Sequence, residues 1–304
     1  MTPAIRLGGE QPTSDGAGPP AHSARVRRGS LELNSIPTRT LSTAGRGRPA
    51  ILLHGWMDNA ETWLDVLGRL AEAERPAIAY DQPGFGAAPP LRDGNVLDQL
   101  VDFAASAVES VAAESGEKVI VAGNSLGGWV ALRLAARADL PLAGIVPISP
   151  AGIRMAPLFF TIDRIPAVRR IIGLPAPVPP AAVRTVVGRL YRALGFGDPA
   201  AAPQPAVERF VRGVGLDRPV IAERLAYAKR LRPDLAEPFD AARVEVPVHV
   251  IWGDHDRLTI PQGAAELAEL VPHARVEMLA GVGHTPQVEA PDVVVAAIEG
   301  LAGS

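Results

Sequence analysis

A serine stands between two glycines in the pentapeptide 123–127, Gly-Asn-Ser-Leu-Gly. Four apolar residues, 119–122, precede it, and a stretch of good helix formers, 129–136, follows it. A strand–turn–helix junction of this kind strains the serine backbone and projects the hydroxyl from the carboxyl edge of a sheet. The pattern predicts that Ser125 is a nucleophile for acyl transfer, a role that needs a base and an acid from elsewhere in the chain.

The predicted base is His284. It lies in the glycine-rich segment 281–286, between the last predicted strand and the last predicted helix, on the sheet edge that should also carry Ser125. An imidazole there can take the proton of the serine hydroxyl and return it to the leaving group. By contrast, His249 lies inside an apolar strand, where a packed core residue is the simpler interpretation.

Two aspartates compete for the role of the acid. Asp254 and Asp256 both follow the penultimate predicted strand, 246–252, and so should reach the same edge of the sheet. The separation from His284 leaves room for one helix and one strand between acid and base. The residues alone do not choose between the two carboxylates.

Acyl transfer also needs donors for the developing oxyanion. The backbone N–H of Leu126, directly after the nucleophile, is one predicted donor. The second should come from the loop 54–59 after an apolar strand, and Trp56 is the residue best placed to donate. His54 is either a hydrogen-bonding residue that shapes this loop, which we favour, or a second base. We include His54 and Asn124 among the candidate substrate-binding residues.

Strands and helices alternate along the first half of the chain and again after residue 240. The strands are near-continuous apolar runs, as in a parallel sheet that is covered on both faces. We predict an α/β fold with a mostly parallel, doubly wound sheet of about eight strands. The predicted strands, besides one or two edge strands in 31–41, cover 50–53, 77–80, 119–122, 142–148, 246–252 and 274–279.

The alternation of strands and helices stops between residues 152 and 240, which hold prolines and helical patterns but no convincing buried strand. We predict a helical cap over the carboxyl ends of the strands, where open α/β sheets bind ligands. The core then comprises 30–151 and 241–304, and 1–29 is a flexible leader rich in Gly, Pro, Ser and Arg. The most apolar part of the cap lines a pocket or packs against the core, and its candidate substrate-binding residues are Met155, Leu158 and Phe159.

Composition excludes several classes of function. The chain has 304 residues, is 47% apolar and carries a net charge of −3, so nothing electrostatic favours nucleic acid or an anionic membrane. It has no cysteine, which excludes a disulfide, a thiolate metal site and a cysteine nucleophile. No apolar run is long enough for a transmembrane helix. We expect a cytoplasmic protein with no cofactor and no metal, and the sequence does not give its oligomeric state.

Four motifs in order carry a family resemblance: His-Gly-Trp at 54–56, Asp-Gln-Pro-Gly-Phe-Gly at 81–86, the pentapeptide, and Gly253-x-x-Asp256 with Gly-His at 283–284. Over residues 31–302 the chain resembles the α/β-hydrolase fold family. Within it, the chain is similar to the capped group of esterases, carbon–carbon-bond hydrolases of ring-cleavage products, haloperoxidases and epoxide hydrolases. The resemblance implies that Asp256, not Asp254, is the acid.

The same resemblance narrows the chemistry. Epoxide hydrolases and haloalkane dehalogenases of this group use an aspartate where this chain has Ser125, so those two activities are set aside. The main hypothesis is a serine hydrolase that cleaves a small hydrophobic ester or acyl substrate with water through an acyl-enzyme. The alternative is a carbon–carbon-bond hydrolase of diketone acids with the same triad, which a positively charged pocket would favour. A non-catalytic ligand-binding protein is the third hypothesis.

Overall fold

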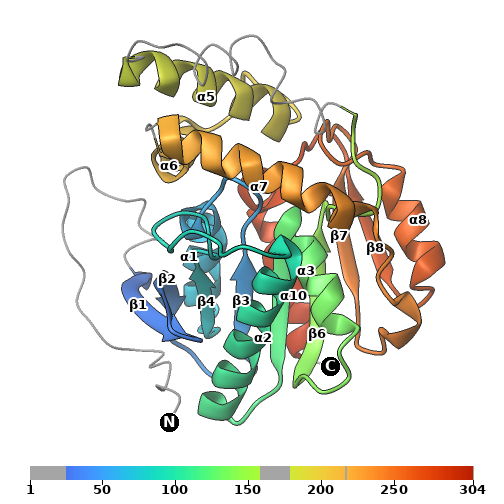
Figure 1. Ribbon diagram of the computed structural model, residues 1–304. Helices are drawn as coiled ribbons and strands as arrows, with labels where there is room; N and C mark the ends of the chain where they lie inside the picture. The colour runs from blue at the N-terminus through green and yellow to red at the C-terminus, as the bar shows by residue number, and fades with distance from the viewer. Residues whose placement is uncertain (1–24, 158–178, 216–217, 304) are drawn as a thin grey trace.

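The computed structural model describes residues 25–157, 179–215 and 218–303 (Figure 1). Within them, eight strands form one open sheet in the order β1-β2-β4-β3-β5-β6-β7-β8. β1 pairs with β2, and β2 with β4, in antiparallel fashion, whereas all pairs from β4 to β8 are parallel. The strands are β1 (Arg27–Leu33), β2 (Ile36–Thr43), β3 (Ala50–Leu53), β4 (Ala77–Tyr80), β5 (Val119–Asn124), β6 (Leu142–Ile148), β7 (His249–Gly253) and β8 (Arg275–Leu279). The predicted mostly parallel α/β sheet is confirmed.

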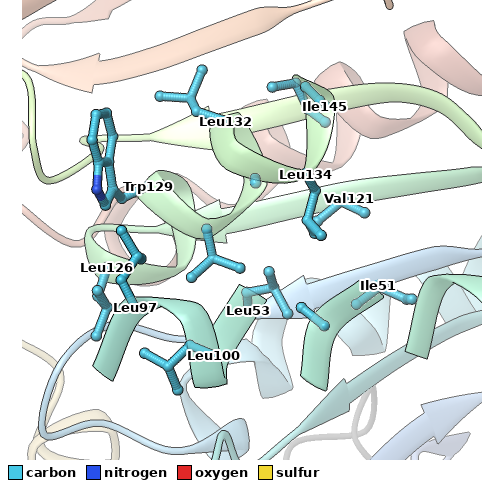
Figure 2. Packing of buried hydrophobic residues seen from close by; sticks show 14 of the residues in the cluster. Ile51, Leu53, Leu97, Leu100, Val121, Leu126, Trp129, Leu132, Leu134 and Ile145 are labelled. Atoms are coloured by element: carbon cyan, nitrogen blue, oxygen red, sulfur yellow. The ribbon is translucent and has the colours of Figure 1, made fainter. Parts of the chain in front are cut away.

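Helices cover both faces of the sheet because successive strand residues point to opposite sides. Ile51 and Leu53 of β3 pack in one apolar cluster with α2 (Val96–Ser115) and α3 (Leu126–Ala135), as Figure 2 shows. Leu52, between them, packs in a second cluster with α1 (Leu64–Glu72) and α10 (Pro291–Ala302). The sheet is therefore doubly wound, and its apolar strands are buried on both faces.

Several element boundaries differ from the sequence prediction. β1 begins at Arg27, inside the segment 1–29 predicted as a flexible leader, and a turn at Asn34 and Ser35 joins it to β2. The predicted helix at 60–73 begins as a 3₁₀ helix, η2 (Ala60–Trp63), which Asn59 caps by accepting the N–H of Glu61, and continues as α1. β7 begins at His249 rather than 246, since Pro247 has no N–H for regular pairing.

The segment 152–240 contributes three helices in its described part. They are α5 (Pro180–Gly195), α6 (Gln204–Val214) and α7 (Arg218–Ala236), and they lie together over one end of the sheet, at the top of Figure 1. A proline in the first two positions of α5 and of α6 suits their start, where a missing N–H costs no hydrogen bond. Leu158 and Phe159 lie outside the described residues.

The chain returns from these helices to the core through a short 3₁₀ helix, η4 (Ala241–Arg243), which leads into β7. The remaining helices are α8 (Gly263–Leu270), between β7 and β8, and the four-residue α9 (Pro286–Glu289), directly before α10. Across the described ranges, no helix is both long and apolar enough to cross a membrane.

Candidate active site

Ser125 occupies the sharp turn between β5 and α3. Its backbone has φ 55° and ψ −113°, a conformation that costs a non-glycine residue about 1–3 kcal/mol. A side chain at Gly123 would lie 2.2 Å from the carbonyl oxygen of Gly127, and one at Gly127 would lie 2.2 Å from that of Leu53. Both glycines are thus required because strand, turn and helix touch backbone to backbone.

Backbone hydrogen bonds hold this turn in place. The N–H of Ser125 donates to the carbonyl of Ile148 in β6 at 2.9 Å, and the N–H of Ala151 donates to the carbonyl of Ser125 at 2.9 Å. Trp129 N–H also donates to the Ser125 carbonyl, at 3.0 Å, as the first turn of α3. These bonds fix the backbone on both sides of the residue, so the position of its side chain is set by the sheet and not by a loose loop.

Asp256 and His284 form a buried pair at the same edge of the sheet. The Asp256 Oδ2 atom lies 2.8 Å from His284 Nδ1, and the two residues are 7% and 6% exposed. Burial alone would raise the pKa of Asp256. The charge and hydrogen bond of His284, together with hydrogen bonds from Thr259 and Leu258, hold that pKa below its ordinary value. The ionised carboxylate then keeps the proton of the ring on Nδ1, which leaves Nε2 to exchange a proton.

Thr259 belongs to this pair, and the sequence reasoning missed it. Its hydroxyl donates to Asp256 Oδ2 at 2.7 Å, while the N–H groups of Leu258 and Thr259 donate to Oδ1 at 2.8 and 2.9 Å. An aspartate followed two and three residues later by free N–H groups forms a local turn around its own carboxylate. The spacing Asp256-x-x-Thr259 is therefore the signal that could have found it.

The other candidate acid, Asp254, is exposed. Its Oδ1 atom accepts the N–H of Gly281 at 2.7 Å, so it caps the loop that carries His284 without touching the imidazole. Position and burial separate the two aspartates where their spacing in the sequence could not.

The loop 54–59 packs directly against the serine turn. A side chain at Gly55 would lie 3.3 Å from both Ser125 Cβ and Asn124 Oδ1, and Trp56 lines the same cavity as Ser125. Leu126 is the first residue of α3, so its N–H is one of those that a helix leaves without an intrahelical acceptor. Both predicted oxyanion donors thus belong to segments that meet at Ser125.

His54 lies behind this loop and does not line the cavity. Its ring is fully buried, with Nδ1 2.8 Å from the carbonyl oxygen of Gly55 and Nε2 accepting the N–H of Gln82 at 2.9 Å. Burial lowers the pKa of His54 to about 4, so the ring is neutral. This placement corrects the candidate role of His54 in substrate binding and agrees with the interpretation that it shapes the loop.

A buried ion pair anchors the far end of the loop. Asp81, in the 81–86 turn, accepts two hydrogen bonds from Arg39 at 3.0 and 3.1 Å and one from the N–H of Ala60 at 2.8 Å. Burial acts to raise the pKa of Asp81, but the Arg39 guanidinium outweighs it and holds the pKa low. Arg39 also donates to Asn59 Oδ1 at 2.9 Å, so the pair secures the loop's last residue.

A single cavity of about 140 Å³ contains Ser125 and His284, and residues of α5, α6 and α7 line it. Met155, predicted to bind substrate, lines it, as does Asn124, although the Asn124 Nδ2 atom donates to the carbonyl of His284 at 2.9 Å. Most of its wall is apolar, and no lysine or arginine lines it in the described part of the chain. Its other lining residues from α5, α6 and α7 are Val186, Val187, Leu190, Tyr191, Leu194, Gly195, Phe210, Ile221 and Leu225.

In the three described ranges, no group of three or more His, Cys, Asp or Glu side chains is arranged to hold a metal ion.

An open, mostly parallel sheet with a serine on a strained strand-to-helix turn and a buried Asp–His pair at the same edge defines the α/β-hydrolase class. A sequence model of the Alpha/beta hydrolase family matches residues 50–297, most of the chain. The chain therefore belongs to this family and has the α/β-hydrolase fold.

Three comparisons place it further. The chain is 30% identical over 253 residues, 82% of its length, to the dihydrolipoyllysine-residue acetyltransferase component of the acetoin cleaving system of Pseudomonas putida. It is 29% identical over 307 residues to esterase Rv0045c of Mycobacterium tuberculosis, covering 93% of this chain and 90% of the esterase. The crystal structure of 2-hydroxy-6-oxo-6-phenylhexa-2,4-dienoate hydrolase from Rhodococcus superposes with a TM-score of 0.73 at 19% identity, covering 92% of this chain and 99% of that one.

Coverage of the relatives is uneven. The chain spans 61% of the Pseudomonas acetyltransferase component and 64% of its counterpart from Cupriavidus necator. The likeness to the Rhodococcus hydrolase is one of fold.

Proposed function

We propose that this protein is a serine hydrolase that cleaves an uncharged, largely apolar carboxylic ester. The observation that carries the proposal is the shared cavity: Ser125 on its strained turn and His284 line one apolar pocket, and Asp256 lies behind the imidazole, with its Oδ2 2.8 Å from Nδ1. A nucleophile, a base and an orienting acid in one cavity are the requirements for acyl transfer.

In the proposed reaction, Ser125 attacks the ester carbonyl while His284 Nε2 takes its proton. The N–H groups of Leu126 and Trp56 stabilise the oxyanion. His284 returns the proton to the departing alcohol, and an acyl-enzyme remains. A water molecule, activated by the same imidazole, then releases the acid and restores Ser125. Asp256 holds the ring in the required tautomer throughout and stabilises its charged form.

The charge of the pocket supports an ester over a ring-cleavage diketone acid. A carbon–carbon-bond hydrolase of the alternative hypothesis must bind a substrate carboxylate, and a cationic wall would serve that purpose. The described wall carries no cation and does carry the carboxyl group of Asp58. Burying an unpaired substrate carboxylate against such a wall is unfavourable. Similarity to an esterase over 93% of the chain also supports ester hydrolysis.

The test is the Ser125→Ala variant. It should lose labelling by a fluorophosphonate probe, and its kcat/KM for p-nitrophenyl butyrate should fall by about 10³-fold or more. Ser106→Ala, which removes a hydroxyl that bonds on the outer surface of α2, is the matched control and should match wild type. Retained labelling or turnover in Ser125→Ala would contradict the proposal, as would faster turnover of a ring-cleavage diketone acid than of any ester.

A further inference from the structure

The proposed reaction gives no role to Asp58, although this residue lines the catalytic cavity. It is 5% exposed and follows Trp56 by two positions in the oxyanion loop. Met57, between them, has φ 59°, a left-handed conformation that is costly for a side chain of its size. Trp56, Met57 and Asp58 all line the cavity, so this strained turn brings three consecutive residues to the substrate.

The carboxyl group is held in a defined orientation. Its Oδ1 atom accepts the N–H of Asn59 at 2.9 Å, and the side chain of Thr62 also hydrogen-bonds to it. The N–H of Asp58 donates to the carbonyl of Gly55 at 3.3 Å. A polar group fixed in this way in a mostly apolar wall can orient a ligand, because a few placed polar groups set specificity in such pockets.

No cation neutralises the Asp58 carboxyl within the cavity wall that the structure describes. The nearby Arg209 donates instead to Asp65 at 2.9 Å. Burial raises the pKa of Asp58 to about 7, and the charge of Asp81 adds to it, while hydrogen bonds from Asn59 and Thr62 and the charge of Arg209 lower it. Tyr191, which also lines the cavity, is buried and remains a neutral phenol.

A substrate hydroxyl fits this carboxyl better than a charged group does. Asp58 lies in a wall that has no lysine or arginine among its described residues, and its Oδ1 already accepts the Asn59 N–H. Because burial also raises its pKa, a ligand must suit it both as a carboxylate, which only accepts hydrogen bonds, and as a carboxylic acid, which also donates one. A hydroxyl can donate and accept, so it complements both forms. An ammonium group complements only the ionised form, and a substrate carboxylate only the protonated form.

We propose that Asp58 is a specificity-determining residue that binds a hydroxyl group of the substrate, so that the preferred substrates are hydroxyl-bearing esters. This inference rests on the proposed ester hydrolysis at Ser125 and adds the chemical class of the ester. The hydroxyl lies on the acyl chain or on the alcohol, and the experiment has an arm for each.

The experiment compares each hydroxyl-bearing ester with an ester in which a methyl group replaces the hydroxyl. Hydrolysis of both esters is measured at pH 7 by pH-stat titration of the acid released. One arm uses ethyl esters of ω-hydroxy acids of increasing length, and the other uses butyrate monoesters of diols. Wild type should favour the hydroxyl-bearing partner in at least one arm by about tenfold or more in kcat/KM, mostly through KM. Asp58→Leu should abolish that ratio, and Asp58→Asn, which still accepts a hydrogen bond, should keep part of it.

Two controls make the result specific. Asp93→Asn, an exposed aspartate in the turn before α2, should keep the wild-type ratio. Thermal denaturation and circular dichroism show whether the Asp58 variants are folded. If Asp58→Leu does not fold, the hydroxyl-to-methyl ratio of kcat/KM in Asp58→Asn tests the inference.

The inference is overturned if wild type shows no hydroxyl preference in either arm. It is also overturned if folded Asp58 variants keep the full ratio, or if an ammonium or carboxylate in the same place is preferred to the hydroxyl. Failure of the proposed function itself looks different, because Ser125→Ala would then still hydrolyse the esters.

Discussion

Replacing Asp256 with asparagine should disable the imidazole without moving it. Oδ1 of Asp256 accepts two backbone N–H groups, from Leu258 and Thr259. In Asp256→Asn the amide oxygen must keep that place, because an NH₂ group there would face two donors. The NH₂ group then occupies the position of Oδ2, which is 2.8 Å from His284 Nδ1.

An NH₂ group at that position donates a hydrogen bond, so Nδ1 must accept it. The proton of the neutral imidazole then resides on Nε2, and this nitrogen can no longer take the proton of Ser125. Loss of the correct tautomer in a Ser-His-Asp triad lowers turnover about 10⁴-fold, or about 5 kcal/mol of transition-state stabilisation at 1.36 kcal/mol per decade. The ring stays in place, so KM should change little.

The assay is steady-state hydrolysis of p-nitrophenyl butyrate by wild type, Asp256→Asn and Asp254→Asn. The Asp254 variant is the matched control, because that carboxylate is exposed and accepts a hydrogen bond from the N–H of Gly281 rather than from the imidazole. The activity of Asp254→Asn should stay within about threefold of wild type. Adding Asp256→Asn to Ser125→Ala should cost little more, because the triad acts as a unit. Asp256→Asn within tenfold of wild type, or a larger loss in Asp254→Asn, would refute this assignment of the acid.

Two further predictions concern stability. Gly127→Ala would place a methyl group 2.2 Å from the Leu53 carbonyl oxygen, so its melting temperature and esterase activity should both fall sharply. Gly300→Ala, in open space on α10, should instead stabilise by about 0.5–1 kcal/mol, and calorimetry that finds the two variants alike would contradict the packing argument. The pKa of Asp58 is raised from 3.8 to about 7, so between these values the folded protein holds a proton that the unfolded chain releases. The free energy of unfolding therefore falls as pH rises from 4 through 7. Asp58→Asn should therefore gain roughly 4 kcal/mol relative to wild type between pH 4 and pH 8 in urea unfolding, and a pH-independent difference would show that Asp58 is not titrating there.

The sequence predicted well the features that depend on residues close together in the chain. The two glycines around Ser125 are required by contacts within a single strand–turn–helix, so the pentapeptide and its flanks sufficed to predict the turn. The alternation of apolar strands and helices predicted a sheet covered on both faces because each strand residue must face one layer or the other. His284 could be placed because it follows the last strand.

Contacts between distant segments escaped the sequence reasoning. His54 looked like a candidate for substrate binding, yet its ring nitrogens are occupied by Gly55 and by Gln82, which the sheet brings beside it from the next strand. Asp58 drew no attention because it lines a cavity together with residues of α5, α6 and α7, and no sequence periodicity reveals how these helices pack on the core. The choice between Asp254 and Asp256 likewise needed a family resemblance, since both follow the same strand.

One arginine, Arg224, links α6 and α7 to the core and to the loop 54–59. Arg224 of α7 is 5% exposed, and its guanidinium donates to the carbonyl oxygens of Gly213 and Val214 at the end of α6 and to that of Gly86 in the core. Its own carbonyl accepts the indole N–H of Trp56 at 3.0 Å.

α7 therefore contacts the loop 54–59 through a hydrogen bond from Trp56, the residue whose backbone N–H is proposed to stabilise the transition state. On the other side, the segment after β4 holds the loop: the N–H of Gln82 donates to His54 Nε2 at 2.9 Å, and Asp81 Oδ1 accepts the N–H of Ala60 at 2.8 Å. A loop fixed from both sides keeps its N–H groups directed at one point, which is what preorganised oxyanion stabilisation requires. α7 thus lines the pocket through Ile221 and Leu225 and also accepts a hydrogen bond from the loop that carries the proposed oxyanion donor, so a change in α7 should affect both substrate contacts and the position of that loop.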